Sequence, residues 1–252
     1  MSPGRRERPS TRPARRLDPA GRLLAADHTV LTTDPRGINR SRVDDPDQDS
    51  TPQLRAGDLC RLLAHLDAGP AAVLGSSGGA VTALALAQAH PAQVRAVVAH
   101  ELPLNELLED REQLRAQTED IIATYLDGNV AAAWAKFLAL ASIVLPESAL
   151  QEMYGGERDP QQVADEHFWF AREMRGTTRW QPDLAALRSA GTRIVVGIGA
   201  DSAGQICDRT SRTLAAALGT EPAIFPGGHI GFVEDPARFA AKLRDFLPGN
   251  QP

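Results

Sequence analysis

Cysteine is scarce in this chain. Cys60 and Cys207 are the two cysteines among 252 residues, and neither stands in a spacing typical of a metal site. This count does not support a secreted domain held by disulfides, and we expect a reducing, cytoplasmic compartment. Long apolar runs are missing too, because no segment approaches the roughly 20 apolar residues of a membrane-spanning helix. We therefore expect no membrane partner.

The chain also lacks an excess of positive charge. The formal net charge is −5, which gives no basis for expecting the folded part of the chain to bind nucleic acid. Arginines gather in residues 1–16, but prolines and polar residues surround them without apolar periodicity. This composition predicts a disordered, solvated tail rather than a basic arm or a targeting peptide. The sequence contains no motif for a metal, a nucleotide or a flavin, so we expect no cofactor.

Short apolar segments alternate with helical patterns along the rest of the chain. Strands are predicted at residues 29–33, 71–76, 94–99, 193–197 and 223–225, and helices at 17–27, 53–66, 78–90, 211–218 and 235–247. This alternation predicts an α/β fold, with a mostly parallel sheet flanked by helices. Residues 17–103 and 181–252 are predicted to form its core. Residues 104–180, which have a helical pattern and all three tryptophans, are predicted to form a helical cap.

The segment that starts at Ala71 reads AAVLGSSGGA and holds the pattern G-x-S-x-G between a predicted strand and a predicted helix. In this context the pattern indicates a nucleophile elbow, where a tight strand-to-helix turn exposes the hydroxyl of Ser77 above the sheet edge. The turn requires small residues two positions away on either side, which Gly75 and Gly79 supply. The N–H of Gly78 begins the following helix, so it is placed to stabilise a developing oxyanion.

A serine hydroxyl becomes a strong nucleophile when a neighbouring base takes its proton. His229 is the candidate base, because it lies in a glycine-flanked loop before the last predicted helix, where no bulky neighbour restricts its ring. His100, at the end of the predicted strand 94–99, is interpreted as the buried terminus of that strand, and contact with substrate is the alternative.

Together, three features resemble the α/β-hydrolase superfamily from its fourth strand onward: GSSGG after an apolar strand, the D-x-R-G-x-x-x-S segment from Asp34 to Ser41, and a late GGH loop. The resemblance covers residues 17–248. It implies a serine hydrolase in which Ser77 is the nucleophile, His229 is the base and a helical cap shapes the substrate pocket. It also implies a structural, loop-ordering role for Asp34.

The resemblance leaves two candidates for the acid of the catalytic triad. In most of the superfamily the acid follows the seventh strand, and Asp201 falls one residue short of that position. A second arrangement, similar to that of the haloalkane dehalogenases, puts the acid after the sixth strand, where this chain has Glu101. Glu101 is favoured because it lies at the carboxyl end of the strand beside the elbow strand, and Asp201 stays the alternative.

The chain departs from the superfamily before residue 29. The resemblance calls for three earlier strands and an H-G type loop that donates a second oxyanion N–H, but an arginine- and proline-rich segment stands there. The missing third strand would lie between the strand at 29–33 and the elbow strand, and its loss would leave their backbone groups unpaired. Three explanations are open. The strand at 29–33 pairs directly with the elbow strand, a partner chain fills the gap, or the natural protein starts with a different sequence.

These features predict an esterase-like serine hydrolase that cleaves a small or medium, hydrophobic ester or related acyl substrate. Ser77 and His229 would act with Glu101 or Asp201. Serine at the elbow argues against dehalogenase or epoxide-hydrolase chemistry, for which the resemblance calls for aspartate. The alternative is a catalytically impaired relative that binds a small ligand in the capped pocket. In both cases the expected partner is a small molecule, and the sequence is compatible with a homodimer.

Overall fold

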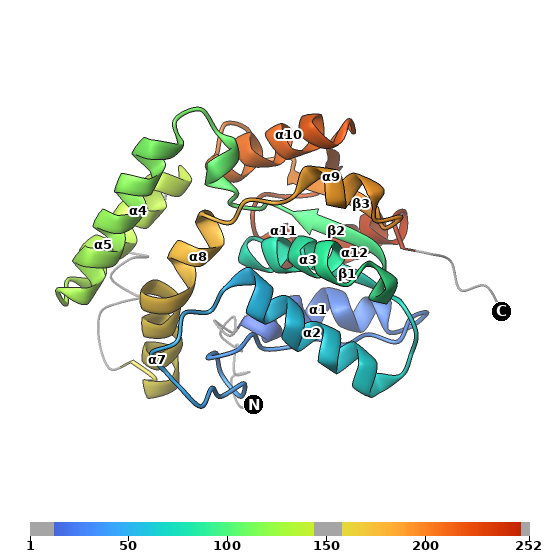
Figure 1. The fold of residues 1–252 in the computed structure, drawn as a ribbon, viewed down its shortest axis with the longest axis horizontal. Coiled ribbons are helices and arrows are strands. Elements are labelled where there is room, and N and C mark those ends of the chain that lie inside the picture. Colours follow the sequence, from blue (N-terminus) through green and yellow to red (C-terminus); the bar gives the residue numbers. More distant parts are fainter. Residues whose placement is uncertain (1–12, 144–157, 248–252) are drawn as a thin grey trace, which may run out of the picture.

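The computed structural model describes residues 13–143 and 158–247 (Figure 1). Its centre is one parallel sheet in the order β1-β2-β3-β4, formed by β1 (Ala71–Ser76), β2 (Val94–His100), β3 (Arg193–Gly199) and β4 (Ala223–Phe225). Ser76 lies opposite His100, and His100 lies opposite Gly197, so the first three strands end at a common edge. The predicted fold class, a mostly parallel sheet flanked by helices, is confirmed.

Helices cover both faces of this sheet (Figure 1). One face packs against α2 (Pro52–Leu66), α3 (Gly78–Ala89), α9 (Leu184–Ser189) and α10 (Ile206–Leu218), and the other against α1 (Pro13–Leu24), α11 (Gly231–Glu234) and α12 (Pro236–Arg244). Side chains alternate along β2, because Val97 and Ala99 join the first core and Val98 joins the second. None of the helices within the described ranges is long and apolar enough to cross a membrane.

The chain between β2 and β3 is mostly helical and occupies the range predicted as a cap. It contains η2 (Asn105–Leu107), α4 (Arg111–Leu126), α5 (Val130–Ala141), α7 (Pro160–Phe168), the π-helical turn η3 (Trp169–Glu173) and α8 (Met174–Thr178). In Figure 1 the helices α4, α5, α7 and α8 gather at one end of the molecule. Helices α4, α5 and α8 and the turn η3 share an apolar core, in which Trp134 stacks on Trp169 with ring centroids 5.4 Å apart.

Two predictions near the N-terminus are corrected by the structure. Residues 29–33 are not a strand, because in the described part of the chain β1 pairs with β2 alone and the segment has no ladder partner. Val30 and Leu31 are accordingly 38% and 47% exposed. Direct pairing of this segment with the elbow strand is therefore wrong. In addition, α1 begins at Pro13, so the last residues of the predicted tail are helical, and residues 1–12 lie outside the described ranges.

The segment from Asp34 to Ser41 forms a tight loop beneath the cap. The buried Asp34 carboxylate accepts hydrogen bonds from Asn39 Nδ2 and Arg40 Nε, each at 3.0 Å, and its carbonyl accepts one from the Ser41 hydroxyl at 2.8 Å. Gly37 has a φ of 79°, and a side chain there would overlap the ring of Phe168. These contacts fit the loop-ordering role predicted for Asp34.

Candidate active site

Ser77 occupies a strained turn between β1 and α3. Its φ of 55° and ψ of −125° lie outside the conformations that residues with a side chain usually adopt. A Cβ at Gly75 would lie 2.2 Å from the carbonyl oxygen of Gly79, so the strand and helix approach each other too closely for any side chain at Gly75. The same requirement was predicted for Gly79 but does not hold, because a Cβ there meets nothing within 4 Å.

The two serines of the elbow face different surroundings. Both serines line a cleft, but the Ser76 hydroxyl also lies 3.1 Å from Nδ1 of His100. His100 is fully buried and makes edge-to-face contacts with Phe225 and Phe239. Burial lowers the pKa of His100 to about 4, so the ring is neutral near pH 7. His100 is therefore a buried strand terminus, as predicted, and not a residue that contacts substrate.

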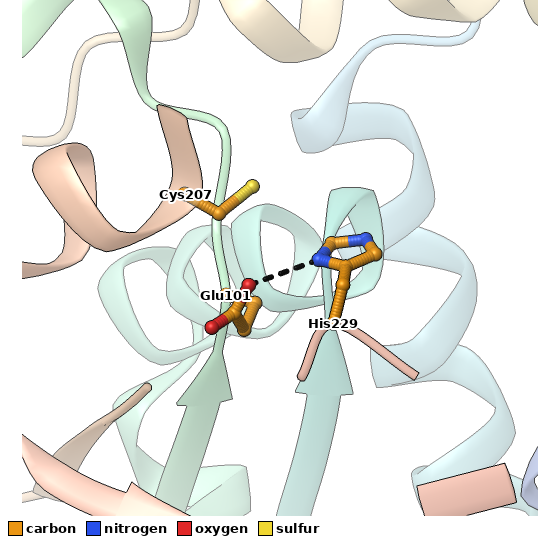
Figure 2. Close-up of side chains that lie close together, drawn as sticks. All are labelled: Glu101, Cys207 and His229. Atoms are coloured by element: carbon orange, nitrogen blue, oxygen red, sulfur yellow. Dashed lines mark hydrogen bonds and ion pairs between the residues drawn. The ribbon is translucent and has the colours of Figure 1, made fainter. Parts of the chain in front are cut away.

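His229 and Glu101 form a hydrogen-bonded pair (Figure 2). His229 belongs to the loop between β4 and α11, and its Nδ1 lies 3.1 Å from Oε2 of Glu101. Glu101 directly follows β2 and is fully buried, and its Oε1 accepts a hydrogen bond of 2.7 Å from the N–H of Gly199. Burial alone would raise the pKa of Glu101, but the hydrogen bonds from His229 and Gly199 outweigh it and hold the pKa below its ordinary value. Glu101 is thus ionised and fixes the orientation of the ring.

Gly199 has a role in this site that the sequence did not reveal. Its N–H holds the Glu101 carboxylate, and a Cβ at this position would lie 2.7 Å from the carbonyl oxygen of Gly227, in the loop that carries His229. The missing side chain therefore allows the end of β3 to pack closely against the histidine loop. A strand-ending glycine followed by a glycine-rich loop is the signal that could have indicated this contact.

Asp201, the alternative acid, lines the same cleft as His229. It is exposed, and its backbone N–H donates to the carbonyl oxygen of Gly227 at 3.1 Å. Within the described ranges its carboxylate makes no hydrogen bond or ion pair with His229. The fold brings Glu101 and not Asp201 to the histidine ring, and the catalytic roles of both residues stay predictions.

Cys207 is a further member of the cluster that the sequence did not indicate. It lies in the first turn of α10, and its thiol and the polar atoms of Glu101 and His229 all lie within 4.8 Å of one another (Figure 2). Burial would lower the pKa of His229, but the neighbouring Cys207 and Glu101 outweigh it and raise the pKa above its ordinary value of 6.5. The spacing of cysteines along the chain could not reveal this cluster, because its three members come from distant segments.

A buried ion pair lies beside the elbow. The Arg55 guanidinium lies 3.6 Å from the Glu173 carboxylate, and both side chains are at most 10% exposed. A Cβ on Gly78 would lie 3.4 Å from Oε1 of Glu173, so the carboxyl group is close to the start of α3. Burial raises the pKa of Glu173, and the charge of Arg55 acts against that rise. Neither residue stood out in the sequence.

Ser77, Gly78, Cys207 and His229 line a cleft of about 3350 Å³. The cap contributes aromatic side chains to the lining of this cleft, namely Trp134, Phe137 and Trp169. The cleft continues along β1 toward residues 29–33. The described side chains show no hydrogen bond between the Ser77 hydroxyl and the His229 ring. Such a bond is often long without substrate and tightens when substrate binds, so its geometry does not decide the role of either residue.

Comparison with known proteins agrees with this architecture. The alpha/beta hydrolase family matches residues 11–242. An uncharacterized hydrolase of Bacillus subtilis, YraK, is 28% identical over 232 residues, which cover 89% of this chain and 80% of that protein. An esterase from Exiguobacterium antarcticum shares the fold with a TM-score of 0.68 at 16% identity, covering 92% of this chain and 87% of the esterase. A putative non-heme bromoperoxidase from Mycobacterium tuberculosis, BpoC, has a TM-score of 0.58 at 23% identity, covering 90% and 83% of the two chains.

Proposed function

The chain belongs to the alpha/beta hydrolase family, and we propose that it is a serine hydrolase with esterase-like activity. Membership of the family supports a hydrolytic reaction. The observation that carries the finer proposal is the pairing of His229 with the buried carboxylate of Glu101, 3.1 Å away, beside a cleft that Ser77 also lines. A base oriented by an acid next to a strained serine is the arrangement that nucleophilic catalysis requires.

The reaction then proceeds in two steps. The Ser77 hydroxyl attacks the carbonyl carbon of the ester while Nε2 of His229 takes its proton, and the Glu101 carboxylate stabilises the resulting imidazolium. The N–H of Gly78, at the positive end of α3, donates a hydrogen bond to the oxyanion. His229 passes its proton to the departing alcohol, and a water molecule releases the acid from Ser77 by the same route.

A hydrophobic acyl group of small or medium size is the substrate class we infer. The cap presents aromatic side chains to the cleft, among them Trp134 and Trp169, and such walls bind apolar groups. Both cysteines are free, which supports the reducing, cytoplasmic location proposed for the enzyme.

Labelling with a fluorophosphonate probe tests the proposal, because covalent capture requires an activated serine but no knowledge of the natural substrate. We expect the purified protein to be labelled at Ser77, as located by peptide mass spectrometry. Ser77→Ala abolishes labelling, and His229→Ala slows it by at least about 10³-fold because the base is lost.

Ser76→Ala is the matched control, since Ser76 neighbours the proposed nucleophile but turns its hydroxyl to His100. It is expected to keep its labelling. If a folded wild-type protein is not labelled, or if Ser77→Ala is labelled as fast as the wild type, the hydrolase proposal fails. A catalytically impaired protein that binds a small ligand in the cleft would then be the better interpretation.

A further inference from the structure

A thiol lies beside the proposed acid and base without a part in their chemistry. Cys207 is 7% exposed, Glu101 is fully buried, and the His229 side chain is 26% exposed. Figure 2 shows that the three side chains converge from different elements: the end of β2, the first turn of α10 and the loop after β4. The hydrolytic steps use Glu101 and His229, but they require nothing from Cys207.

The three side chains together are a ligand set that Zn²⁺ favours. Zinc is commonly bound by cysteine sulfur, histidine nitrogen and carboxylate oxygen, with bonds of about 2.0–2.3 Å. A tetrahedral site with those bonds separates its ligand atoms by about 3.3–3.8 Å. The three ligand atoms here lie within 4.8 Å of one another. Their separations would therefore have to shorten by at most about 1.5 Å to close the site.

The surroundings also suit a metal ion. The N–H of Gly199 holds Oε1 of Glu101 and thereby orients the carboxylate, as partners of metal ligands commonly do. Cys207 and His229 both line the open cleft, which gives an ion a path of entry and leaves room for water as a fourth ligand. We propose that Glu101, Cys207 and His229 form an inhibitory Zn²⁺ site.

The inhibition follows from which nitrogen the metal would take, and this part rests on the proposed hydrolase function. Nδ1 is the ring nitrogen that faces Glu101 in Figure 2. A zinc ion on Nδ1 displaces any proton there, the Cys207 thiol releases its proton to solvent, and the neutral imidazole carries its one proton on Nε2. Nε2 is then a donor that cannot accept the proton of Ser77. The Glu101 carboxylate, which would otherwise stabilise the imidazolium, is bound to the zinc ion as well.

The test combines an inhibition measurement with a spectroscopic one. Fluorophosphonate labelling is measured over a series of ZnCl₂ concentrations, and each rate is divided by the rate of the same variant in EDTA. Zinc is expected to slow wild-type labelling at least tenfold, and EDTA to restore it. In Cys207→Ala the zinc concentration for half-inhibition rises by at least about tenfold, because a direct ligand is lost. Cys60→Ala is the matched control, since Cys60 lies on α2 outside the cluster, and it keeps the wild-type response.

Titration with Co²⁺ reports on the site independently of catalysis. The ultraviolet charge-transfer band of a cobalt–thiolate bond is expected in the wild type and in Cys60→Ala, and not in Cys207→Ala or Cys207→Ser. If the band is missing from the folded wild type, or if zinc inhibits Cys207→Ala as strongly as the wild type, the proposed site is overturned. A wild-type protein that shows the band but is not labelled in EDTA keeps the metal site and rejects the hydrolase proposal instead.

Discussion

Glu101 adopts a backbone conformation that residues with a side chain rarely adopt. Its φ is 54°, it is fully buried, and its N–H donates to the carbonyl oxygen of Gly197 at 3.0 Å. A buried carboxylate in such a position is tolerated because Gly199 and His229 both donate hydrogen bonds to it. Strained residues of this kind cluster at functional sites, which supports Glu101 as the acid of the triad.

We therefore expect Glu101→Gln to lower kcat/KM for a chromogenic short-chain ester by roughly 10³–10⁴-fold, because an amide favours the wrong histidine tautomer and cannot stabilise an imidazolium. Steady-state kinetics measures the effect. Asp201→Asn is the control and is expected to stay close to the wild-type value, since Asp201 makes no hydrogen bond or ion pair with His229 among the described side chains. Equal losses in the two variants would contradict the assignment.

The sequence alone singles out Ser77 and His229 as the proposed nucleophile and base, but it does not single out the rest of the cluster. The elbow motif is local, so Ser77 stands out within five residues, and a glycine-flanked histidine near the chain end follows from it. The acid depends on which strand end reaches the histidine, and that distance is three-dimensional, so Glu101 and Asp201 both stayed open. Cys207 has no local signal, because the packing of α10 against β3 and against the segment that follows β2 brings it to the cluster.

His100 is expected to make the protein less stable at acid pH. Its pKa is lowered by burial to about 4, whereas an unfolded histidine titrates near 6.5. Below pH 6.5 the unfolded chain therefore binds a proton that the folded protein does not bind until about pH 4, so the folded state loses stability as the pH falls. The loss is about 1.4 kcal/mol per pH unit, or about 3 kcal/mol over the whole interval.

Urea unfolding at several pH values checks this expectation. The free energy of unfolding of the wild type should fall by about 3 kcal/mol more than that of His100→Gln between pH 7 and 4, since glutamine does not titrate. His65→Gln serves as the control, because His65 is exposed, and it should keep the wild-type slope. A parallel pH dependence in wild type and His100→Gln would rule out His100 as the source.

Among the elements, Arg55 joins α2 to α3 and to the end of the cap. Its guanidinium donates to the hydroxyls of Thr82 and Thr177, each at 2.8 Å, and to the carbonyl oxygen of Ser50 at 2.6 Å. It also pairs with Glu173, and desolvation by burial lowers the pKa of the guanidinium although Glu173 counteracts that effect. Through its two threonine partners Arg55 thus connects α3, the helix that follows the elbow, with α8.

Arg55→Ala is expected to lower the free energy of unfolding by about 3–5 kcal/mol, because it leaves the carboxyl group of Glu173 buried without its partner. Denaturant titration gives the value. Arg61→Ala, on the same helix but with a side chain 71% exposed, should cost about 1 kcal/mol or less. The double variant Arg55→Met/Glu173→Leu should recover part of the loss, since it removes both charges. Equal costs for Arg55→Ala and Arg61→Ala would show that the buried pair contributes little.

Most elements of the core could be predicted because buried parallel strands are continuously apolar. β2 and β3 extend the predicted segments by one and two residues, and β4 coincides with its prediction. The segment 29–33, TVLTT, is also rich in β-branched residues and still does not form a strand. Composition indicates that a segment can pair, but a strand also requires a neighbour at hydrogen-bonding distance, which a local pattern cannot report.

At the scale of the whole molecule, β1 is the edge strand of the sheet that residues 13–143 and 158–247 form, and the cleft begins beside it. β1 pairs with β2 on one side, and on the other it lines the cleft that reaches residues 29–33. Val73 and Leu74, at the middle of β1, are accordingly half-buried, although β2 beside it is almost fully buried. An edge strand with open backbone groups exchanges its amide protons readily and accepts an added strand.

We expect hydrogen exchange followed by mass spectrometry to divide the molecule along this line. The amides of residues 29–33 should exchange at nearly the rate of an unstructured peptide, because the described chain offers them no ladder partner. The amides of β2, which pairs with β1 and with β3, should open only with global unfolding, which for a domain of this kind costs about 5–15 kcal/mol. The amides of β1 that face away from β2 should exchange at rates between those of residues 29–33 and those of β2.

Dilution provides the control for this experiment. If residues 29–33 are protected as strongly as β2, a strand from outside the described chain occupies the space between these residues and β1. Protection that disappears on tenfold dilution would then assign that strand to a second copy of the chain, in keeping with a homodimer. Protection that does not change with concentration would mean that the gap is closed within one chain. Rapid exchange at all concentrations would leave β1 as a true edge, and the active site would then form beside an open sheet.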